Sequence, residues 1–231
     1  MADIRGKVAG RLPGTSNSPY IPIAASRNGN MFTADWLARM ALEGRMYTCN
    51  AGTGTAPFTG GGAYVATAPD VDMSVPSGML IIPVFISVTF ETFGTILLHE
   101  IVAAYGKGGV IAPTSATAVT PVNHRLDLGN DSGVTVVSDG TGATYMTPAA
   151  SVVEFWREGT ELRVNKTVTA NLQATQSGTD PNTFKWSALQ TGVWPIMYAT
   201  DGITRLNIFG SSQGPTMFVT ITFVKPPLTT E

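Results

Sequence analysis

The stretch MLIIPVFISVTFE, residues 79–91, decides the fold class of this chain. From Ile86 onward, larger apolar side chains alternate with smaller or more polar ones, which is the period of a strand with one buried face. The first half of the run is apolar at successive positions, so we expect it to be covered on both faces. Pro83 cannot donate a hydrogen bond to a neighbouring strand, which predicts an edge, a bulge or a sheet crossing at this residue.

The sequence after this run predicts a partner strand for it. Gly94 allows a turn, and TILLHEIVAAY, residues 95–105, then leads to a group of glycines that begins at Gly106. A helix over residues 96–104 is the competing interpretation. Glycines flank the run on both sides, and β-branched or aromatic residues lie near both of its ends, so we expect a strand.

Further strands are predicted along the rest of the chain. Residues 151–157 and 161–164 indicate two strands joined by a tight turn. Residues 203–209 and 217–224 alternate well, and two prolines end the last run. Counting the shorter runs, about eight strands are expected. This predicts an all-β fold, a jelly roll or two-sheet antiparallel β-sandwich.

One short helix is predicted near the N-terminus, over residues 33–43. Thr33 can cap it, and Gly44 permits a left-handed stop. Its apolar residues fall at helical spacing: Trp36, Leu37, Met40 and Ala41. We expect this stripe to pack on the sheet or under a neighbouring molecule. If the Trp36 ring is buried, Trp36→Ala should cost several kcal/mol of stability.

The composition indicates one domain with little charge on its surface. The chain has 231 residues, of which 43% are hydrophobic and only 13% are charged, about half the charged share usual for a soluble domain. Its 25 glycines and 15 prolines favour strands joined by turns. The single cysteine, Cys49, excludes an intramolecular disulfide. Packing or assembly must therefore stabilise the fold, and something other than water is expected to cover part of the surface.

Residues 1–30 differ from the rest and are predicted to form an extended arm ahead of a single domain, residues 31–231. The arm has four basic residues against one acidic residue, a net charge of +3, which leaves −5 for the domain because the whole chain carries −2. It is rich in Gly, Pro, Ser and Asn, so it cannot bury enough apolar surface to order by itself. Its candidate interface residues are Arg5, Lys7, Arg11, Tyr20, Ile21 and Ile23. We expect contact with a neighbouring subunit, with nucleic acid as a less favoured partner.

No catalytic, cofactor-binding or metal site is assigned from the sequence. His99-Glu100 begins like a metalloprotease motif, but Ala103 stands where the second histidine is required. Residues 52–62, GTGTAPFTGGG, lack the Lys-Ser/Thr pair of a phosphate loop. The N-terminus lacks the apolar stretch of a secretory signal, and no window is long enough to cross a bilayer as a helix.

A second group of possible chemical residues lies around Trp156. Glu154, Glu158 and Glu161 could supply an acid/base pair beside a sugar stacked on the Trp156 ring. Arginines 157 and 163 lie close by in the sequence, so charge pairing across strands is the favoured interpretation.

The order of features along the chain carries a resemblance to a known class. An Arg-containing arm rich in Pro and Gly is followed by one short helix, by PSGMLIIP at residues 76–83 and by the closing run GPTMFVTITFVKPP at residues 214–227. Together these resemble a single jelly-roll capsid protein of a small virus such as a bacteriophage. The resemblance implies a shell subunit without catalytic activity, whose arm threads between neighbouring copies. It also implies synthesis in the host cytoplasm, location in the virion, and copies of itself and other virion proteins as partners.

Self-assembly is therefore the expected function, since interface cores are depleted in charge. One alternative is a carbohydrate-binding module or the receptor-binding head of a phage fibre, in which Trp186, Trp194 and Tyr145 would be exposed and stack on sugar. A second alternative is a β-sandwich hydrolase. It would need His99 or His124 beside a carboxylate in a cleft.

Overall fold

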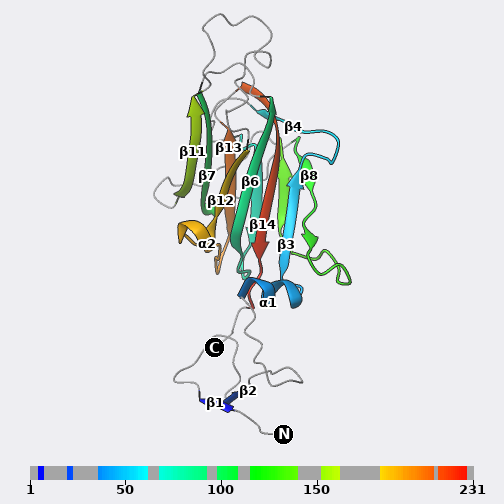
Figure 1. The fold of residues 1–231 in the computed structure, drawn as a ribbon, viewed down its shortest axis with the longest axis vertical. Coiled ribbons are helices and arrows are strands. Elements are labelled where there is room, and N and C mark those ends of the chain that lie inside the picture. Colours follow the sequence, from blue (N-terminus) through cyan, green and yellow to red (C-terminus); the bar gives the residue numbers. More distant parts are fainter. Residues whose placement is uncertain are drawn as a thin grey trace, which may run out of the picture.

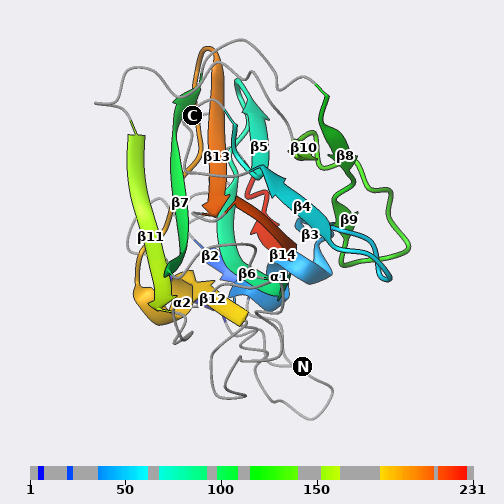
Figure 2. The same ribbon diagram turned by 90° about the horizontal axis from the view of Figure 1, so that it is seen from above.

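The computed structural model of this chain consists of two antiparallel sheets packed face to face (Figures 1 and 2). The structure describes residues 5–7, 20–22, 36–61, 68–92, 98–108, 115–139, 152–161, 183–210 and 213–227. The β13 sheet contains, in spatial order, β11 (Val152–Glu161), β7 (Leu98–Gly108), β13 (Ile203–Gly210), β5 (Val71–Pro76), β10 (Thr135–Ser138) and β8 (Thr117–Val119). The β14 sheet contains β12 (Thr183–Ser187), β6 (Ile82–Thr92), β14 (Gln213–Val224), β3 (Met46–Ala51) and β9 (Val122–Asn123), and β4 (Phe58–Gly61) also pairs with β14.

Eight of these strands follow the order of a jelly roll, which confirms the predicted fold class. Numbered one to eight along the chain, they are β3, β5, β6, β7, β11, β12, β13 and β14. In these numbers the β14 sheet has the order 6-3-8-1 and the β13 sheet the order 5-4-7-2. These are the two interleaved four-stranded sheets of a jelly roll.

The two runs that decide the fold class are both strands, but they do not pair. Residues 82–92 form β6 in one sheet and residues 98–108 form β7 in the other, so the predicted partnership is wrong while the strand assignment over the helix is confirmed. The partner of β7 is β11. A glycine between two apolar runs signals a change of direction, but it does not specify whether the chain stays in its sheet or crosses to the other.

Two other expectations need correction. Strand β11 continues through residues 158–160, where a tight turn was expected, and Gly159 pairs with Glu100 of β7. The glycine-rich stretch after β3 contains a short strand, β4, rather than a loop throughout. In both places pairing with a long neighbouring strand outweighs the local preference of glycine for turns.

Pro83 lies beside a β-bulge, as its missing N–H predicts. On β14, Thr222 pairs with Phe85 and Phe223 pairs with Pro83, so Val84 is the extra residue on β6. The bulge turns Val84 out of the central core. It packs instead against Met40 and Val224, beneath the first helix.

Helix α1 (Trp36–Leu42) follows the sequence prediction at its C-terminal end. Met40 is buried against the sheet, and Gly44 adopts the left-handed conformation, with φ of 70°, that ends the helix. Trp36, however, remains 39% exposed in the lone chain, so the condition for a cost of several kcal/mol, a buried ring, is not met, and its packing under a neighbouring molecule stays a prediction. A second helix, α2 (Ala188–Thr191), was not expected. Among the described residues, no helix has the length and apolar character needed to span a membrane.

The central core lies between the two sheets and is formed by alternate residues of the facing strands. Its largest fully buried members include Trp186, Phe90, Phe223, Met73, Ile86, Leu206 and Ile208. Each such side chain contributes about 1.5–3 kcal/mol of transfer free energy. Packing in this core therefore fixes the positions of the strands, and with them the ends of the strands to which the surface loops are joined.

Part of the predicted arm forms a strand pair of its own. Strands β1 (Arg5–Lys7) and β2 (Tyr20–Pro22) are antiparallel, with Gly6 opposite Ile21, and they belong to neither large sheet. Figure 1 draws them beyond α1. Arg11 and Ile23 lie outside the described residues, and the interface role of all the arm residues stays a prediction.

Candidate functional site

Large apolar side chains stay exposed on three segments that contact one another: α1, residues 193–198 after α2, and the loop after β9. Figure 1 draws α1 and α2 at the same end of the sandwich. We name eight of these exposed side chains the end surface: Trp36, Leu42, Leu126, Leu128, Val193, Trp194, Ile196 and Tyr198. Among the described residues, the other exposed large apolar side chains are Val122, Val153 and Leu189. Single exposed leucines are ordinary on a soluble protein, but an apolar patch marks an interaction site.

The segment after α2 supplies one flank of this surface. Met197 exchanges two backbone hydrogen bonds with Ile81, of 3.0 and 2.9 Å, and its side chain is fully buried in the core. Because side chains of an extended segment alternate in direction, Ile196 and Tyr198 must then point outward. The core itself therefore forces these two residues into solvent.

An aromatic contact joins this flank to α1. The rings of Trp36 and Trp194 lie with their centroids 5.9 Å apart and their planes at 78°, an edge-to-face arrangement. Both rings remain exposed. Trp36 therefore belongs to the surface rather than to the core.

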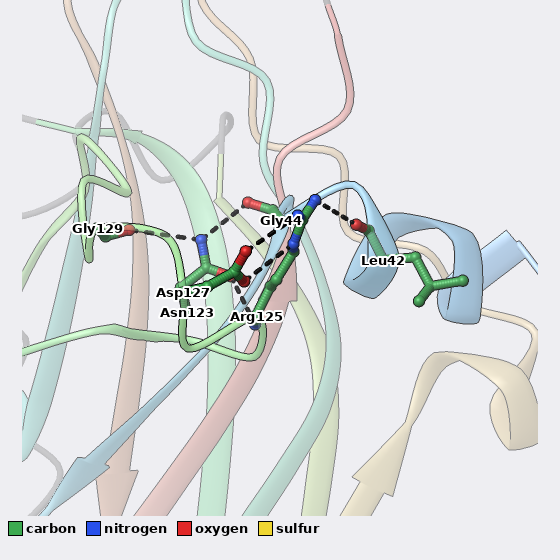
Figure 3. Close-up of polar contacts among 6 residues, drawn as sticks. All are labelled: Leu42, Gly44, Asn123, Arg125, Asp127 and Gly129. Carbon is green, nitrogen blue, oxygen red and sulfur yellow. Dashed lines mark hydrogen bonds and ion pairs between the residues drawn. The ribbon is translucent and has the colours of Figure 1, made fainter.

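The loop after β9 supplies the other flank, and polar contacts hold it to the end of α1 (Figure 3). The buried Asn123 donates from Nδ2 to the carbonyls of Gly44 (3.0 Å) and Gly129 (3.4 Å), while its Oδ1 accepts from the backbone N–H of Arg125 (2.9 Å). Arg125 Nη1 donates to the carbonyl of Leu42 at 3.1 Å. These bonds satisfy carbonyls at the C-terminal end of the helix.

A fork of two hydrogen bonds stiffens the same loop. Arg125 donates to both carboxylate oxygens of Asp127, each at 3.0 Å, and this bonding holds the pKa of Asp127 below its ordinary value. Leu126 lies between these residues and is 82% exposed. Leu128 lies over Gly44, where an added Cβ would be 2.1 Å from Leu128 Cδ1. The loop thus holds Leu126 out in solvent on a constrained backbone.

A surface hollow of about 410 Å³ opens beside the first flank. Its lining includes Tyr105, Lys107, Ile196, Tyr198, Thr200 and Asp201. Lys107 Nζ lies 3.1 Å from Asp201 Oδ1, and the bond lowers the pKa of this exposed carboxyl. The hollow therefore combines two tyrosines and an isoleucine with one ion pair.

A buried ion pair lies on the face of the β13 sheet that points away from the core. Leu206 and Ile208 face the core, so Arg205 and Asn207 face the opposite way. Arg205, only 2% exposed, donates to Asp72 and to Ser74, and Asn207 Nδ2 donates to Asp72 Oδ1 at 2.8 Å. The cluster ties β5 to β13.

His124, the histidine whose side chain is described, does not show the hydrolase arrangement. Within the described residues, the ring of His124 is hydrogen-bonded to the hydroxyl of Thr48 at 2.6 Å, not to a carboxylate. The side chain of His99 lies outside the described part. The described residues include no group of three or more His, Cys, Asp or Glu that could hold a metal ion. Burial raises the pKa of the Cys49 thiol to about 12, so it is a poor nucleophile.

Of the aromatic residues proposed for sugar stacking, Trp186 is buried and Trp194 is exposed. Trp186 is 1% exposed and packs on Phe155 with ring centroids 4.8 Å apart, so it cannot stack on a sugar. Trp194 is exposed as expected, and Tyr145 lies outside the described residues. The pattern of β12 contains the missed signal, because Phe184 and Trp186 alternate with polar residues and share its buried face.

Of the three carboxylates near Trp156, Glu154 is in charge pairing, Glu158 accepts a hydrogen bond from Trp156 Nε1 at 3.3 Å, and the side chain of Glu161 lies outside the described part, as does Arg163. Arg157 donates to both carboxylate oxygens of Glu154, each at 2.7 Å, and also to Glu100 on the neighbouring strand. The bonding to Arg157 lowers the pKa of Glu154. The pair of Arg157 with Glu154 lies within β11, and the pair of Arg157 with Glu100 joins β11 to β7.

Comparison of the chain with protein-family models, with curated proteins and with solved structures gave no match in any of the three. The class that the coordinates define is a jelly-roll β-sandwich with an apolar end surface. Function must be argued from that surface.

Proposed function

We propose that the protein is a structural subunit that assembles with copies of itself into a shell, as a capsid protein does, and that it is not an enzyme. One observation carries the proposal: the exposed apolar side chains of the end surface belong to segments that contact one another at α1. Burying a leucine fully contributes about 1.5–3 kcal/mol, so leaving several in water favours association.

The low charge of the chain supports the same proposal. Only 13% of its residues are charged, and the stretch VWPIMYAT at residues 193–200 contains none. Depletion of charge with enrichment in aromatic residues is the composition of interface cores. A stable interface buries about 1,200–2,000 Å² in total, which requires a contiguous surface rather than isolated side chains.

The arm supports assembly in a second way. An isolated two-stranded pair such as β1 with β2 is marginally stable in water, so contact with another body would stabilise it. The arm has a net charge of +3 and the domain −5, so the arm of one copy is complementary to the domain of the next. In this proposal Arg5, Lys7, Arg11, Tyr20, Ile21 and Ile23 tether neighbouring subunits.

Sedimentation of the full chain tests the proposal. We expect particles far heavier than the 24.3 kDa subunit, and closed shells in electron micrographs. Ile196→Glu should reduce them to small species, because it places a charge in the end surface. Ala56→Glu is the matched control, since Ala56 is exposed near β4 at the opposite end (Figure 1). A wild-type chain that remains a single subunit at high concentration would overturn the proposal.

A glycan-binding head is the second candidate. It is favoured by the exposed rings of Trp194 and Tyr198, which lie on one rigid segment. A monomer that binds oligosaccharides, and loses this binding in Tyr198→Ala, would support this candidate over assembly.

A further inference from the structure

We propose that copies of the chain associate head to tail, with Leu126 of one copy entering the hollow beside Tyr105 and Tyr198 of the next. This inference rests on the proposed function and names the contact that carries it. The two parts are called the knob, Leu126 with its flanking Arg125 and Asp127, and the hollow, as described above.

The knob is exposed and held in place before any partner arrives. Leu126 is 82% exposed, and the loop around it is bonded to α1 through Asn123 and Arg125. A constrained loop loses little conformational entropy on binding, so most of the free energy of burying the leucine remains available for association.

The hollow has mixed walls of suitable size, in which apolar side chains lie beside polar and charged groups. Its volume of about 410 Å³ lies within the range of sites that accept ligands, so one leucine and its neighbours fit. Tyr105, Ile196 and Tyr198 line it. Two of these walls are fixed, because Met197 between them is anchored in the core.

The charges beside Leu126 and beside the hollow are complementary in one orientation. In the knob, Arg125 and Asp127 flank Leu126 and pair with each other. Beside the hollow, Lys107 pairs with Asp201. In one orientation Arg125 faces Asp201 while Asp127 faces Lys107, and in the reverse orientation like charges meet. Rim charges of this kind contribute to specificity more than to affinity.

The knob cannot enter the hollow of its own subunit. The knob follows β9 and the hollow borders β7, and Figure 2 shows β9 and β7 on opposite sides of the sandwich. A contact between two different patches is heterologous: it builds a ring where the rotation between copies closes and an open filament where it does not, rather than a two-fold dimer. A closed shell requires a second kind of contact as well, which the proposed arm tether would supply.

Disulfide trapping tests the pairing. Cys49 is buried, so engineered thiols dominate the reaction. Full-length Leu126→Cys and Thr200→Cys proteins are mixed and oxidised with oxidised glutathione, and we expect the mixed disulfide dimer in several-fold excess over either homodimer. Leu126→Cys mixed with Ala56→Cys is the control and should give no such excess. Predominance of the Leu126→Cys homodimer, or no cross-link, would overturn the inference.

Sedimentation of Leu126→Asp separates this inference from the proposed function. We expect loss of assembly with an unchanged unfolding midpoint, whereas Ala56→Asp, at an exposed residue near β4 at the opposite end (Figure 1), should assemble normally. If Leu126→Asp still forms shells, the head-to-tail contact is wrong and self-assembly stands. If the wild-type chain never assembles, or if oligosaccharide occupies the hollow of a lone subunit, both proposals fail.

Discussion

Two regions of the molecule reverse the usual placement of side chains. On the β13 sheet, the ion pair of Arg205 and Asp72 is buried, each side chain being 2% exposed. At the end of the sandwich, Leu42 and Leu126 are 70% and 82% exposed. Hydrogen bonds to Ser74 and Asn207 compensate the first reversal within the chain. The second has no such compensation among the described residues, which is why a second copy is proposed as its cover.

The largest expected effect tests the buried half of this comparison. Arg205→Met should destabilise the lone subunit by about 3–5 kcal/mol, because it leaves the buried carboxylate of Asp72 without this cation. Urea unfolding measures the loss. The double variant Asp72→Asn, Arg205→Met should recover part of it, and a double variant as unstable as the single one would contradict this account.

A smaller effect is expected where α1 meets the loop after β9. Gly44→Ala should cost about 1–2 kcal/mol, since Gly44 has φ of 70° and an alanine there is strained. The new Cβ would also displace Leu128. Thermal unfolding measures the cost, and assembly should weaken as well because the knob moves. If the Gly44→Ala variant unfolds at the same temperature as the wild-type protein, the C-terminal end of α1 is not constrained.

Trp36→Ala separates the effect on folding from the effect on assembly. Trp36 is 39% exposed and its ring contacts another exposed ring, so we expect the substitution to lower the free energy of unfolding of the subunit by about 1 kcal/mol. This is well below the cost of removing a fully buried tryptophan. Particle yield should fall more strongly than subunit stability. If urea unfolding shows that Trp36→Ala lowers the free energy of unfolding by several kcal/mol, the Trp36 ring is part of the core.

The smallest expected effect is a pH dependence of the knob. Arg125 lowers the pKa of Asp127 in the folded state, so this contribution is complete above the unfolded value of about 3.9 and is lost as the pH falls through the lower folded value. NMR of the loop amides should therefore report loosening only in acid. Asp127→Asn should show the loosened signals already at neutral pH, and identical spectra for the two proteins would remove the role of this pair.

The sequence predicted the elements better than their partners. Alternation identified β6, β13 and β14, and Pro83 marked the bulge, because these signals are local. Pairing is not local, so β7 was assigned to the wrong neighbour. The end surface was missed for the same reason: the turn residue Leu126 carries no signal of exposure, and only the fold brings α1, residues 193–198 and the loop after β9 together.

The bulge at Val84 provides the packing contact that positions the first helix on the sheet. Since the extra residue directs Val84 at Met40, α1 is positioned by a step in the sheet rather than by its own seven residues. Deleting Val84 should restore regular pairing between β6 and β14, but it should also remove the side chain against which Met40 of α1 packs. A single insertion in one strand thereby sets where neighbouring molecules would meet.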